Sequence, residues 1–315
     1  GSYWHSFLKA RQSPYFIDRL IESGYKFFIA SGISLSFPEF KQTNFIRIVD
    51  YINDNYDGTT PDKRDQQATN DVQKFISTLY DDDKFFIFLL LDSSHSTYNF
   101  PDEFAKYKPY TRSYHYAEAL NKDLVEKIIN RYKNSVYYVD HLIGKIITTL
   151  KKHDKFKNTI ILISGDHAEE FYEYGFWGHV SGFSPAQIQV PMIIYVPDMQ
   201  NQNYYHHTQH QDVVPTMLKI LHDPNDHQIH SIGKIMFKKP QDNKHTYLVS
   251  CGWEKCALID SLGWLIFGTE TYSFAQNEIL NTEYKPLHDT LSDKNLNIRT
   301  QNIIKVMQEM TKFLQ

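Results

Sequence analysis

The chain has no long hydrophobic run. None of its apolar stretches approaches the roughly 18 residues of a transmembrane helix, and its first residues do not have the pattern of a signal peptide. An excess of one charge is also missing, since the formal net charge is -4, which gives no electrostatic case for nucleic acid or a basic membrane-binding surface. Internal repeats and low-complexity tracts are absent as well. What remains is an ordinary globular chain of 315 residues, enough for one large α/β domain or two smaller ones.

Cysteine is scarce. The chain has two, Cys251 and Cys256, in TYLVSCGWEKCALID, whose flanks are typical of two strands joined by residues 252–255. Cysteines that face each other in a hairpin can form a disulfide in an oxidising compartment. The alternative is a pair of small buried thiols. Zinc binding is disfavoured, because no second thiol or histidine pair stands at ligand spacing.

The sequence does contain apolar runs typical of parallel strands that are covered on both faces. They span residues 25–31, 84–92, 159–166 and 190–197. Before the first run lies a helical segment in which Pro14 suits the first turn and Gly24 the stop. A long helical pattern over 113–151 separates the second and third runs. This alternation predicts an α/β fold with a doubly wound, mostly parallel sheet flanked by helices.

Other segments complete the predicted organisation. Residues 54–71 are polar enough to be a surface loop. From about residue 243 the pattern changes to short strand-like pieces and a closing helix near 298–314. We therefore expect an α/β core over residues 3–242, and over 243–315 a small antiparallel β subregion with a terminal helix, packed as part of the same domain.

Reactive side chains follow two of the predicted strands. The run LLLDSSH ends with Asp92 and His95, and LISGD ends with Asp166 next to His167. His179, twelve residues farther on, can return to the same edge from a connecting loop. Ligands of doubly wound sheets bind beyond the C-terminal ends of the strands, and Asp with His suits zinc or manganese better than magnesium. Each residue alone has an ordinary alternative as a loop or strand-end side chain, but together they predict a metal-assisted phospho- or sulfo-transfer site.

A second group of histidines is interpreted differently. YYHHTQHQ, residues 204–211, opens a predicted helical region that reaches residue 222. Metal capture is the less favoured interpretation of this group. A solvated loop that enters a helix, with Asp212 near the N-cap, is favoured instead.

At this point the segments resemble a known family. ISGDHAEEF, WGH and QIQVPMIIYVP resemble the sulfatase branch of the alkaline phosphatase superfamily, as do LLDSSHSTYNFP and HQDVVPTML, in the family's order. The opening segment and SIGKIMF are most like the periplasmic domain of PbgA/YejM-type inner-membrane proteins. Those proteins carry an N-terminal transmembrane bundle and are implicated in lipopolysaccharide and cardiolipin homeostasis.

The resemblance implies roles for the candidate residues. Asp166 and His167 would be ligands of a divalent metal, which is manganese, zinc or magnesium. His95 and His179 would face the substrate phosphate or hold a second metal, as in lipid A phosphoethanolamine transferases. Such a site would stabilise charge on the oxygens of the transferring group.

Neighbouring residues have weaker assignments. Glu169 and Glu170 are candidates for orienting a histidine from behind. The aromatic residues at 172, 174, 176 and 177 are expected to form a packed loop, with a lipid-contacting role as the alternative. Ala168 stands where the family has glycine, which fits only if that position does not need a positive φ.

The family's catalytic nucleophile has no counterpart in this sequence. The family places an acidic ligand on its first strand and a Ser, Thr or Cys nucleophile on the next helix. We expect both to lie upstream, because Gly1-Ser2 is typical of an expression scar. The core is therefore expected to lack its first strand and nucleophile helix, to bind metal weakly and not to turn over substrate alone.

Two functions are compatible with this pattern. The first is a membrane-anchored domain on the periplasmic side of the inner membrane of a Gram-negative bacterium, involved in envelope lipid homeostasis. Its expected partners are anionic lipid or lipopolysaccharide, its own N-terminal transmembrane region and an inner-membrane protein, with no role for nucleic acid. The alternative is an active metal-dependent hydrolase of phosphate or sulfate esters, or a phosphoryl-group transferase, that acts on lipid or glycan.

Overall fold

The computed structural model describes most of the chain as two compact units. The described residues are 8–113, 115, 121–180, 182–225, 231–237, 247–252, 254–268, 277–287 and 293–312. One unit comprises residues 11–163 and 192–199, and the other comprises residues 1–10, 164–191 and 200–315. No described helix combines the length and the apolar character needed to cross a bilayer. Residues 238–246 lie outside the described residues, so the boundary expected at residue 242 stays a prediction.

A parallel sheet forms the centre of the unit that begins at residue 11. Strand β1 (Lys26–Ser31) lies between β2 (Ile52–Asn53) and β3 (Phe85–Leu90), and both neighbours run parallel to it. The same unit holds β7 (Met192–Tyr195) and all but the last residue of its partner strand β4 (Ile161–Ser164). Each strand predicted from an apolar run is therefore confirmed to within two residues at either end.

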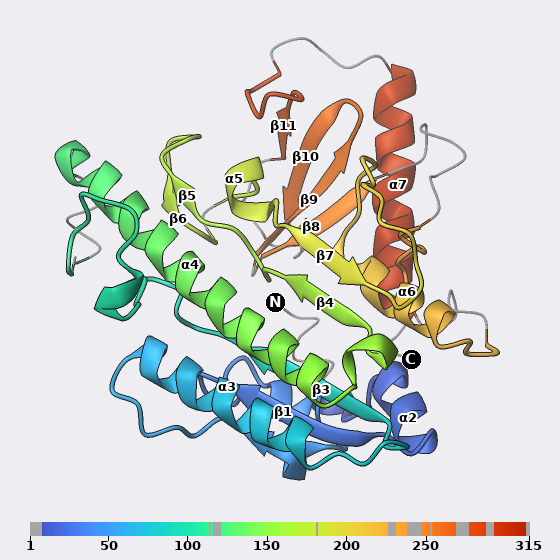
Figure 1. Ribbon diagram of the computed structural model, residues 1–315. Coiled ribbons are helices and arrows are strands. Elements are labelled where there is room, and N and C mark those ends of the chain that lie inside the picture. The colour runs from blue at the N-terminus through green and yellow to red at the C-terminus, as the bar shows by residue number, and fades with distance from the viewer. Residues whose placement is uncertain are drawn as a thin grey trace. The chain divides into compact units, whose positions relative to one another are not determined.

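Helices cover both faces of this sheet. On one face, Ile17 and Leu20 of α2 (Tyr15–Glu22) pack against Phe27 and Ile29. The helix starts after Pro14 and stops before a glycine with φ of 76°, as the sequence predicted. On the opposite face, α3 (Pro61–Ser77) and α4 (Lys122–Lys152) run side by side (Figure 1).

The helix α3 corrects the sequence analysis. Residues 54–71 were predicted to be a surface loop, and this is wrong from Pro61 onward. The polar composition concealed a narrow stripe of buried residues at helical spacing, namely Asp65, Ala68, Thr69, Val72 and Ile76. The predicted long helix starts later than expected, at Lys122, and residues 114 and 116–120 lie outside the described part of the chain.

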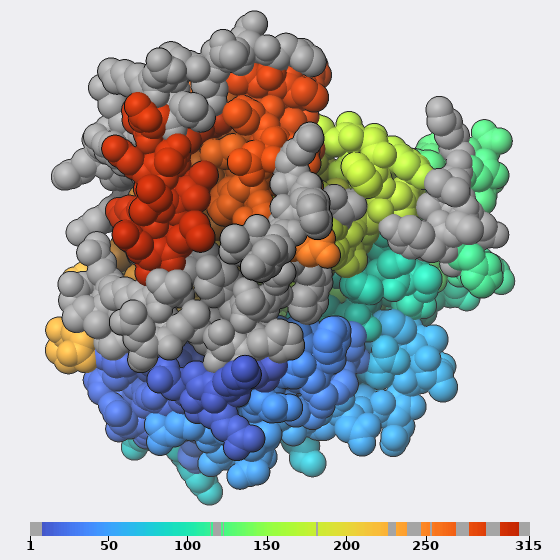
Figure 2. Space-filling model, turned by 180° about the vertical axis from the view of Figure 1, so that it is seen from behind, coloured from blue at the N-terminus to red at the C-terminus, as the bar shows by residue number. Residues whose placement is uncertain are grey.

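The other unit contains an antiparallel sheet and a long helix. The sheet has the order β11-β10-β9-β8, with these bounds: β8 (Leu248–Cys251), β9 (Lys255–Asp260), β10 (Gly263–Gly268) and β11 (Glu278–Leu280). Val306 of α7 (Asp293–Lys312) packs against Val249 and Leu258. Figure 2 shows α7, in red, at the surface of this unit. The predicted antiparallel subregion with a terminal helix is confirmed.

The two cysteines are joined. Cys251 and Cys256 are directly opposite in the β8–β9 ladder, with their Cα atoms 4.1 Å apart, and form a disulfide. The sequence left open a disulfide or a pair of buried thiols, and the structure has the disulfide.

Shorter elements connect these parts. They are the hairpin of β5 (Glu170–Phe171) and β6 (Trp177–Gly178), the helices α5 (Pro185–Ile188) and α6 (Val213–Ile220), and 3-10 turns at Phe40–Gln42, Val49–Tyr51, Asp102–Phe104, Phe156–Asn158 and His210–Asp212. The helix predicted near 204–222 is thus shorter than expected. It is entered through a capping box, in which Gln209 and Asp212 each bond the backbone of the other.

Candidate functional site

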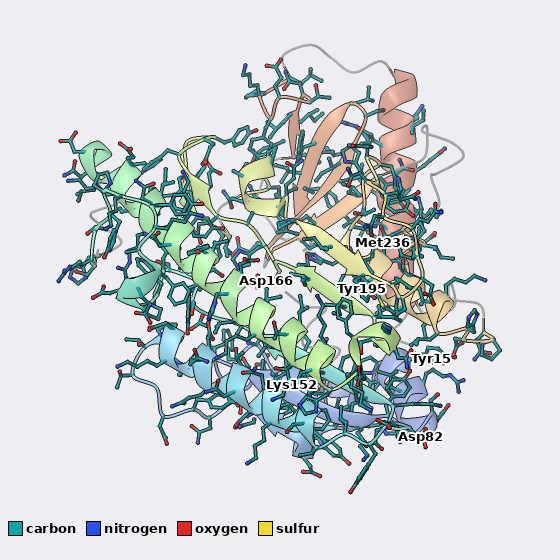
Figure 3. All side chains as sticks on the ribbon, in the orientation of Figure 1. Tyr15, Asp82, Lys152, Asp166, Tyr195 and Met236 are labelled. Atoms are coloured by element: carbon teal, nitrogen blue, oxygen red, sulfur yellow. A yellow bond between two sulfur atoms is a disulfide. The ribbon has the colours of Figure 1, made fainter. Side chains whose placement is uncertain are left out.

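The strand β4 leads into a tight turn that presents Asp166. At Gly165 an added Cβ would lie 3.1 Å from the carbonyl oxygen of His167 and 3.2 Å from Val190 Cγ1, so the close approach favours glycine. Asp166 accepts the backbone N–H of His167 on Oδ1 at 2.9 Å, and its side chain is 75% exposed. The carboxylate therefore stands at the C-terminal end of β4, open to solvent (Figure 3).

Three predicted histidines share one feature, a hydrogen bond at Nδ1. His167 Nδ1 lies 3.0 Å from the carbonyl oxygen of Ala168, and His95 Nδ1 lies 3.1 Å from that of Ser96. His179 Nδ1 lies 3.3 Å from Glu169 Oε1. A carbonyl or carboxylate oxygen only accepts, so each Nδ1 carries a hydrogen and the neutral ring keeps its lone pair on Nε2. This tautomer is the one expected of a histidine that binds a metal through Nε2.

His167 and His179 lie together in one unit. Their rings stack with centroids 4.0 Å apart. The hydrogen bond to Glu169 raises the pKa of His179, burial opposes this, and the charges of Glu169 and Asp166 raise the pKa further. Glu169 itself is only 7% exposed, which keeps its carboxylate directed at the ring. The pair thus places two imidazoles and two carboxylates in one small region.

The donor chemistry fits a divalent metal in part. His167 Nε2 and Asp166 Oδ2 lie 3.7 Å apart. Two ligands of a tetrahedral zinc, each about 2.1 Å from the ion, are about 3.4 Å from each other, so this pair is close to a suitable bite. Among the described residues no three His, Cys, Asp or Glu side chains converge as a complete ligand set. Asp166 and His167 could therefore hold part of a metal's coordination shell, which other groups would have to complete.

Ala168 and Glu170 position the loop that carries these residues. Ala168 is not among the described non-glycine residues with positive φ, so alanine is accommodated there. Its N–H donates to the carbonyl of Gln187 at 2.9 Å. Glu170 is fully buried and accepts four hydrogen bonds, from the backbone of Tyr174 and Phe176 and from the side chains of Ser184 and Gln187.

This buried carboxylate fixes the β5–β6 hairpin. Burial raises the pKa of Glu170, but its hydrogen bonds outweigh burial and lower the pKa overall. The packed loop predicted here is only partly packed, because Trp177 is 7% exposed whereas Phe176 is 54% exposed. The role of Glu170 in orienting a histidine stays a prediction, as do the other assigned roles.

His95 lies in the other unit, on the segment that follows β3. Asp92 and Ser93 precede it, and both are held by Asp65 of α3. One oxygen of Asp65 accepts the N–H of Asp92 at 2.9 Å, and the other accepts the N–H of Ser93 at 2.7 Å and its hydroxyl at 2.5 Å. Sequence analysis missed Asp65 because the residue was assigned to a loop. The only available signal was its position in the buried stripe of α3.

Arg64 and Gly32 complete this network. Arg64 donates Nε to the carbonyl of Gly32 at 2.6 Å, and Nη2 to Asp92 Oδ2 at 3.3 Å. An added Cβ at Gly32 would lie 1.9 Å from Asp65 Oδ1, so only glycine fits beside the carboxylate. The ends of β1 and β3 are thus tied to α3 by charged and backbone groups.

His210 is a second residue that the sequence did not single out. It belongs to the histidine segment predicted to be a solvated loop, yet its Nε2 lies 2.9 Å from the carbonyl oxygen of Gly165. The same nitrogen lies 3.4 Å from Ser164 Oγ. His210 therefore supports the turn that carries Asp166. In the same segment, His206 Nε2 lies 2.8 Å from the carbonyl oxygen of Met236.

Solved structures share the fold of this chain. A protein of the alkaline phosphatase superfamily from Vibrio parahaemolyticus matches with a TM-score of 0.64 at 17% identity, covering 97% of this chain and 70% of that one. The lipoteichoic acid synthase LtaP from Listeria monocytogenes matches with a TM-score of 0.58 at 15% identity, covering 96% of this chain and 72% of its own. The fold is thus that of the sulfatases and alkaline phosphatases.

Curated relatives match shorter stretches. Phosphoethanolamine transferase EptA from Escherichia coli K12 is 28% identical over 145 residues, which is 44% of this chain and 26% of EptA. The Kdo(2)-lipid A phosphoethanolamine 7''-transferase of the same organism is 31% identical over 132 residues, which is 39% of this chain and 21% of that enzyme. Human iduronate 2-sulfatase is 28% identical over 176 residues, or 45% of this chain and 31% of that enzyme. The matched part is therefore about a quarter of EptA.

The sequence profile of the Sulfatase family matches residues 2–223, most of this chain. That match covers the β4 turn with Asp166 and His167, the hairpin with Glu169 and His179, and the segment with His95. Together with the shared fold, it shows that this chain belongs to the sulfatase family.

Proposed function

We propose that this chain is the sulfatase-like domain of a membrane protein that transfers a phosphate-linked headgroup to or from an envelope lipid. The observation that carries the proposal is the group formed by Asp166, His167 and His179. Its imidazoles have Nδ1 bonded to an oxygen acceptor, and a carboxylate stands at the strand end beside them. Such a group suits the oxygens of a phosphate or sulfate ester better than a neutral substrate.

The chain's own residues would act by binding and orientation. Asp166 and His167 would hold a divalent metal, which when bound polarises an ester oxygen and stabilises the charge that develops on it. His179, held by Glu169, would face the substrate phosphate. When protonated it would pair with a phosphate oxygen.

The names of the relatives support a lipid-linked substrate. Two are phosphoethanolamine transferases, one of them acting on Kdo(2)-lipid A by its name, and a structural neighbour is a lipoteichoic acid synthase. We extend this to a placement on the periplasmic side of a Gram-negative inner membrane. The disulfide between Cys251 and Cys256 supports that placement, because such bonds persist in oxidising compartments.

The test uses the full-length protein with manganese, zinc or magnesium. Substrates would be a generic phosphate monoester and vesicles of a phospholipid with an ethanolamine headgroup, and released phosphate or transferred headgroup would be measured. Asp166→Ala should abolish metal-dependent turnover. The matched control is Asp82→Ala, because Asp82 is exposed in the turn before β3, at the strand end opposite Asp92 (Figure 3). Equal turnover in both variants would contradict the proposal.

A second function is favoured by a different observation. The opening segment and SIGKIMF are most like the periplasmic domain of PbgA/YejM-type proteins. A domain of that kind would recognise lipopolysaccharide or cardiolipin without chemistry. In that case vesicle binding by the wild type and by Asp166→Ala would be equal, and no metal would give turnover.

A further inference from the structure

An exposed loop of this protein carries positive charge and no negative charge. Residues 105–113, with the sequence AKYKPYTRS, contain Lys106, Lys108 and Arg112 but no acidic residue, and all three cations are exposed. The loop lies against the first half of α4 (Figure 1), which adds a further exposed cation, Lys133. The net charge of the whole chain is -4, so its composition conceals this local excess of positive charge.

Buried asparagines of α4 hold the loop in place. Asn134 is fully buried, and its Oδ1 accepts the N–H of Tyr107 at 2.7 Å while its Nδ2 donates to the carbonyl of Tyr107 at 3.0 Å. Asn130, which is also buried, donates to the carbonyl of Pro109 at 2.9 Å. A buried amide without its partners is costly, so these bonds keep the loop on the helix. A loop that is held in this way loses little conformational freedom when its outer side chains bind a partner.

The same helix ties the loop to the segment that carries His95. Arg131 is buried and donates Nε to the carbonyl of Thr97 at 2.6 Å. Its Nη1 donates to the carbonyl of Thr111 at 3.2 Å and to that of Arg112. Thr97 follows His95 closely in the chain. The basic loop and this predicted site residue therefore have a common support within one unit.

Two tyrosines of this region hold lysines over their rings. Lys106 Nζ lies 4.7 Å from the ring centroid of Tyr137 and 5.8 Å from that of Tyr107. Lys133 Nζ lies 5.9 Å from the ring centroid of Tyr107. Neither lysine pairs with a carboxylate within the part of the chain that the structure describes. A ring attracts an ammonium group without neutralising its charge, so both charges are held in place and stay available to an anion.

The region is also partly apolar. Both tyrosines and the adjacent Val136 are exposed, at 37% to 41%. Acidic residues lie around the region, since Glu126 and Asp140 stand two turns before and after Lys133 on α4 and the 3-10 turn Asp102–Phe104 precedes the loop. Lysine beside exposed tyrosine and aliphatic groups suits a membrane–water interface, where the ammonium meets headgroup phosphates and the apolar groups reach below them. A small soluble anion would use the charges and leave the apolar groups exposed.

We propose that these exposed lysines, tyrosines and valine dock the domain on the surface of an anionic phospholipid bilayer. They form the lysine–tyrosine surface, which consists of Lys106, Tyr107, Lys108, Lys133, Val136 and Tyr137. The proposal goes beyond the function proposed above, because it concerns contact with the bilayer and not the chemistry at Asp166. It holds whether or not that site is catalytic.

The first experiment measures flotation of the 315-residue chain with vesicles. Vesicles of equal parts phosphatidylglycerol and phosphatidylcholine should bind the wild type, vesicles of phosphatidylcholine alone should not, and added salt should weaken the binding. Lys106→Gln with Lys133→Gln should weaken binding about 30-fold, the loss expected for two lysines at an anionic surface.

The matched control is Lys151→Gln with Lys152→Gln. It removes the same charge from exposed positions at the other end of α4, and it also breaks a lysine–ring contact, since Lys151 Nζ lies 4.9 Å from the ring centroid of Phe156. The control should bind within about twofold of the wild type, because these charges lie more than a Debye length from the proposed contact. Asp166→Ala should also bind as the wild type does, so failure of catalysis and failure of docking are distinguishable.

Several outcomes would overturn the proposal. They are equal binding by the two double variants, equal binding to both kinds of vesicle, and no binding of the wild type to anionic vesicles at low salt. Displacement from the vesicles by soluble glycerol phosphate, at concentrations that leave the ionic strength unchanged, would overturn it as well. That result would show a site for a free phosphate in place of a docking surface.

The second experiment places a fluorophore on the lysine–tyrosine surface. Both cysteines of the chain are in the disulfide, so one introduced cysteine can be labelled selectively. An environment-sensitive dye at the new cysteine of Val136→Cys should shift its emission to shorter wavelength with anionic vesicles. The same dye on Thr148→Cys, at an exposed position farther along α4, should not shift. Equal shifts at the two positions, or a shift at Thr148→Cys alone, would place the contact elsewhere and overturn the proposal.

Discussion

Acid should stabilise one unit of this protein through Asp65. Burial raises the pKa of Asp65 to about 6, against the lowering effect of its hydrogen bonds from Asp92 and Ser93, and the nearby charge of Asp92 raises it further. The reference value is 3.8, so the folded state binds this proton more readily than the unfolded state does. Stability contributed by the proton is fully present below pH 4 and is lost as the pH rises through 6.

The magnitude follows from these two pKa values. Between pH 7 and pH 5, protonation of Asp65 should add about 1.3 kcal/mol to the free energy of unfolding, and the full effect at lower pH approaches about 3 kcal/mol. The variant Asp65→Asn cannot gain this proton. The side-chain NH2 group of the asparagine would also face the donors of Asp92 and Ser93 that now bond to the carboxylate. This loss of hydrogen bonds should lower the free energy of unfolding by about 2 kcal/mol at pH 7. The wild type should therefore be more stable at pH 7, and its advantage should grow on acidification.

The assay is urea unfolding of both proteins at pH 7 and pH 5. Far-UV circular dichroism is the suitable probe, because the 31-residue helix α4 lies in the same unit as Asp65. Tryptophan fluorescence is not, because the described tryptophans, Trp177 and Trp264, lie in the other unit. Taking the difference between the two proteins cancels other titrating groups, such as Glu170, whose lowered pKa acts in the opposite sense. The reasoning would be refuted if the wild type's advantage over Asp65→Asn in the free energy of unfolding shrank or stayed constant at pH 5. In that case the hydrogen bonds to Asp65, which lower its pKa, would outweigh burial, which raises it.

Three further predictions follow from the packing. Gly32→Ala should destabilise the protein by about 3 kcal/mol or more in thermal unfolding, because the added Cβ meets Asp65. The control is Gly144→Ala, at an exposed position of α4 where an added Cβ has nothing within 4 Å. This control should stabilise the protein by up to about 1 kcal/mol. Cys251→Ser with Cys256→Ser should cost about 2 kcal/mol, since the disulfide closes a short loop with a sequence separation of 5, and unchanged unfolding would contradict this. Glu170→Gln should cost about 2 to 4 kcal/mol, because an amide cannot accept all four hydrogen bonds. Hydrogen exchange of the β5–β6 hairpin should rise with it, and an unchanged hairpin would show that the carboxylate is dispensable.

The strands, and the positions of the residues that follow them, could be predicted because the signals are local. A continuous apolar run marks a covered strand, and the residues that follow it necessarily lie at its C-terminal end. That is why Asp166, His167 and Asp92 were placed correctly at strand ends without any knowledge of tertiary contacts. The helix α3 was missed for a local reason too, since its buried stripe is narrow and includes Asp65 and Thr69, which count as polar in a composition.

The supporting residues could not be predicted because their partners are distant in sequence. Asp65 bonds to Ser93, 28 residues later, and His210 contacts Gly165, 45 residues earlier. Apart from the position of Asp65 in the buried stripe of α3, nothing near either residue distinguishes it from an exposed acid or a loop histidine. The order of the strands is equally non-local and emerges only from the folded arrangement.

The way the chain is divided between its units has a consequence for synthesis and for gene dissection. The boundaries fall between residues 10 and 11, 163 and 164, 191 and 192, and 199 and 200, so neither unit is one continuous stretch. On the ribosome, the unit that starts at residue 11 stays unfinished until β7 has emerged, by which time the turn with Asp166 has already been made. A truncation after residue 163 therefore removes β7, the only described partner of β4, and no single cut separates the units. Either fragment produced by such a single cut should aggregate when it is expressed alone. Two co-expressed fragments whose cut lies within an exposed loop could reassemble.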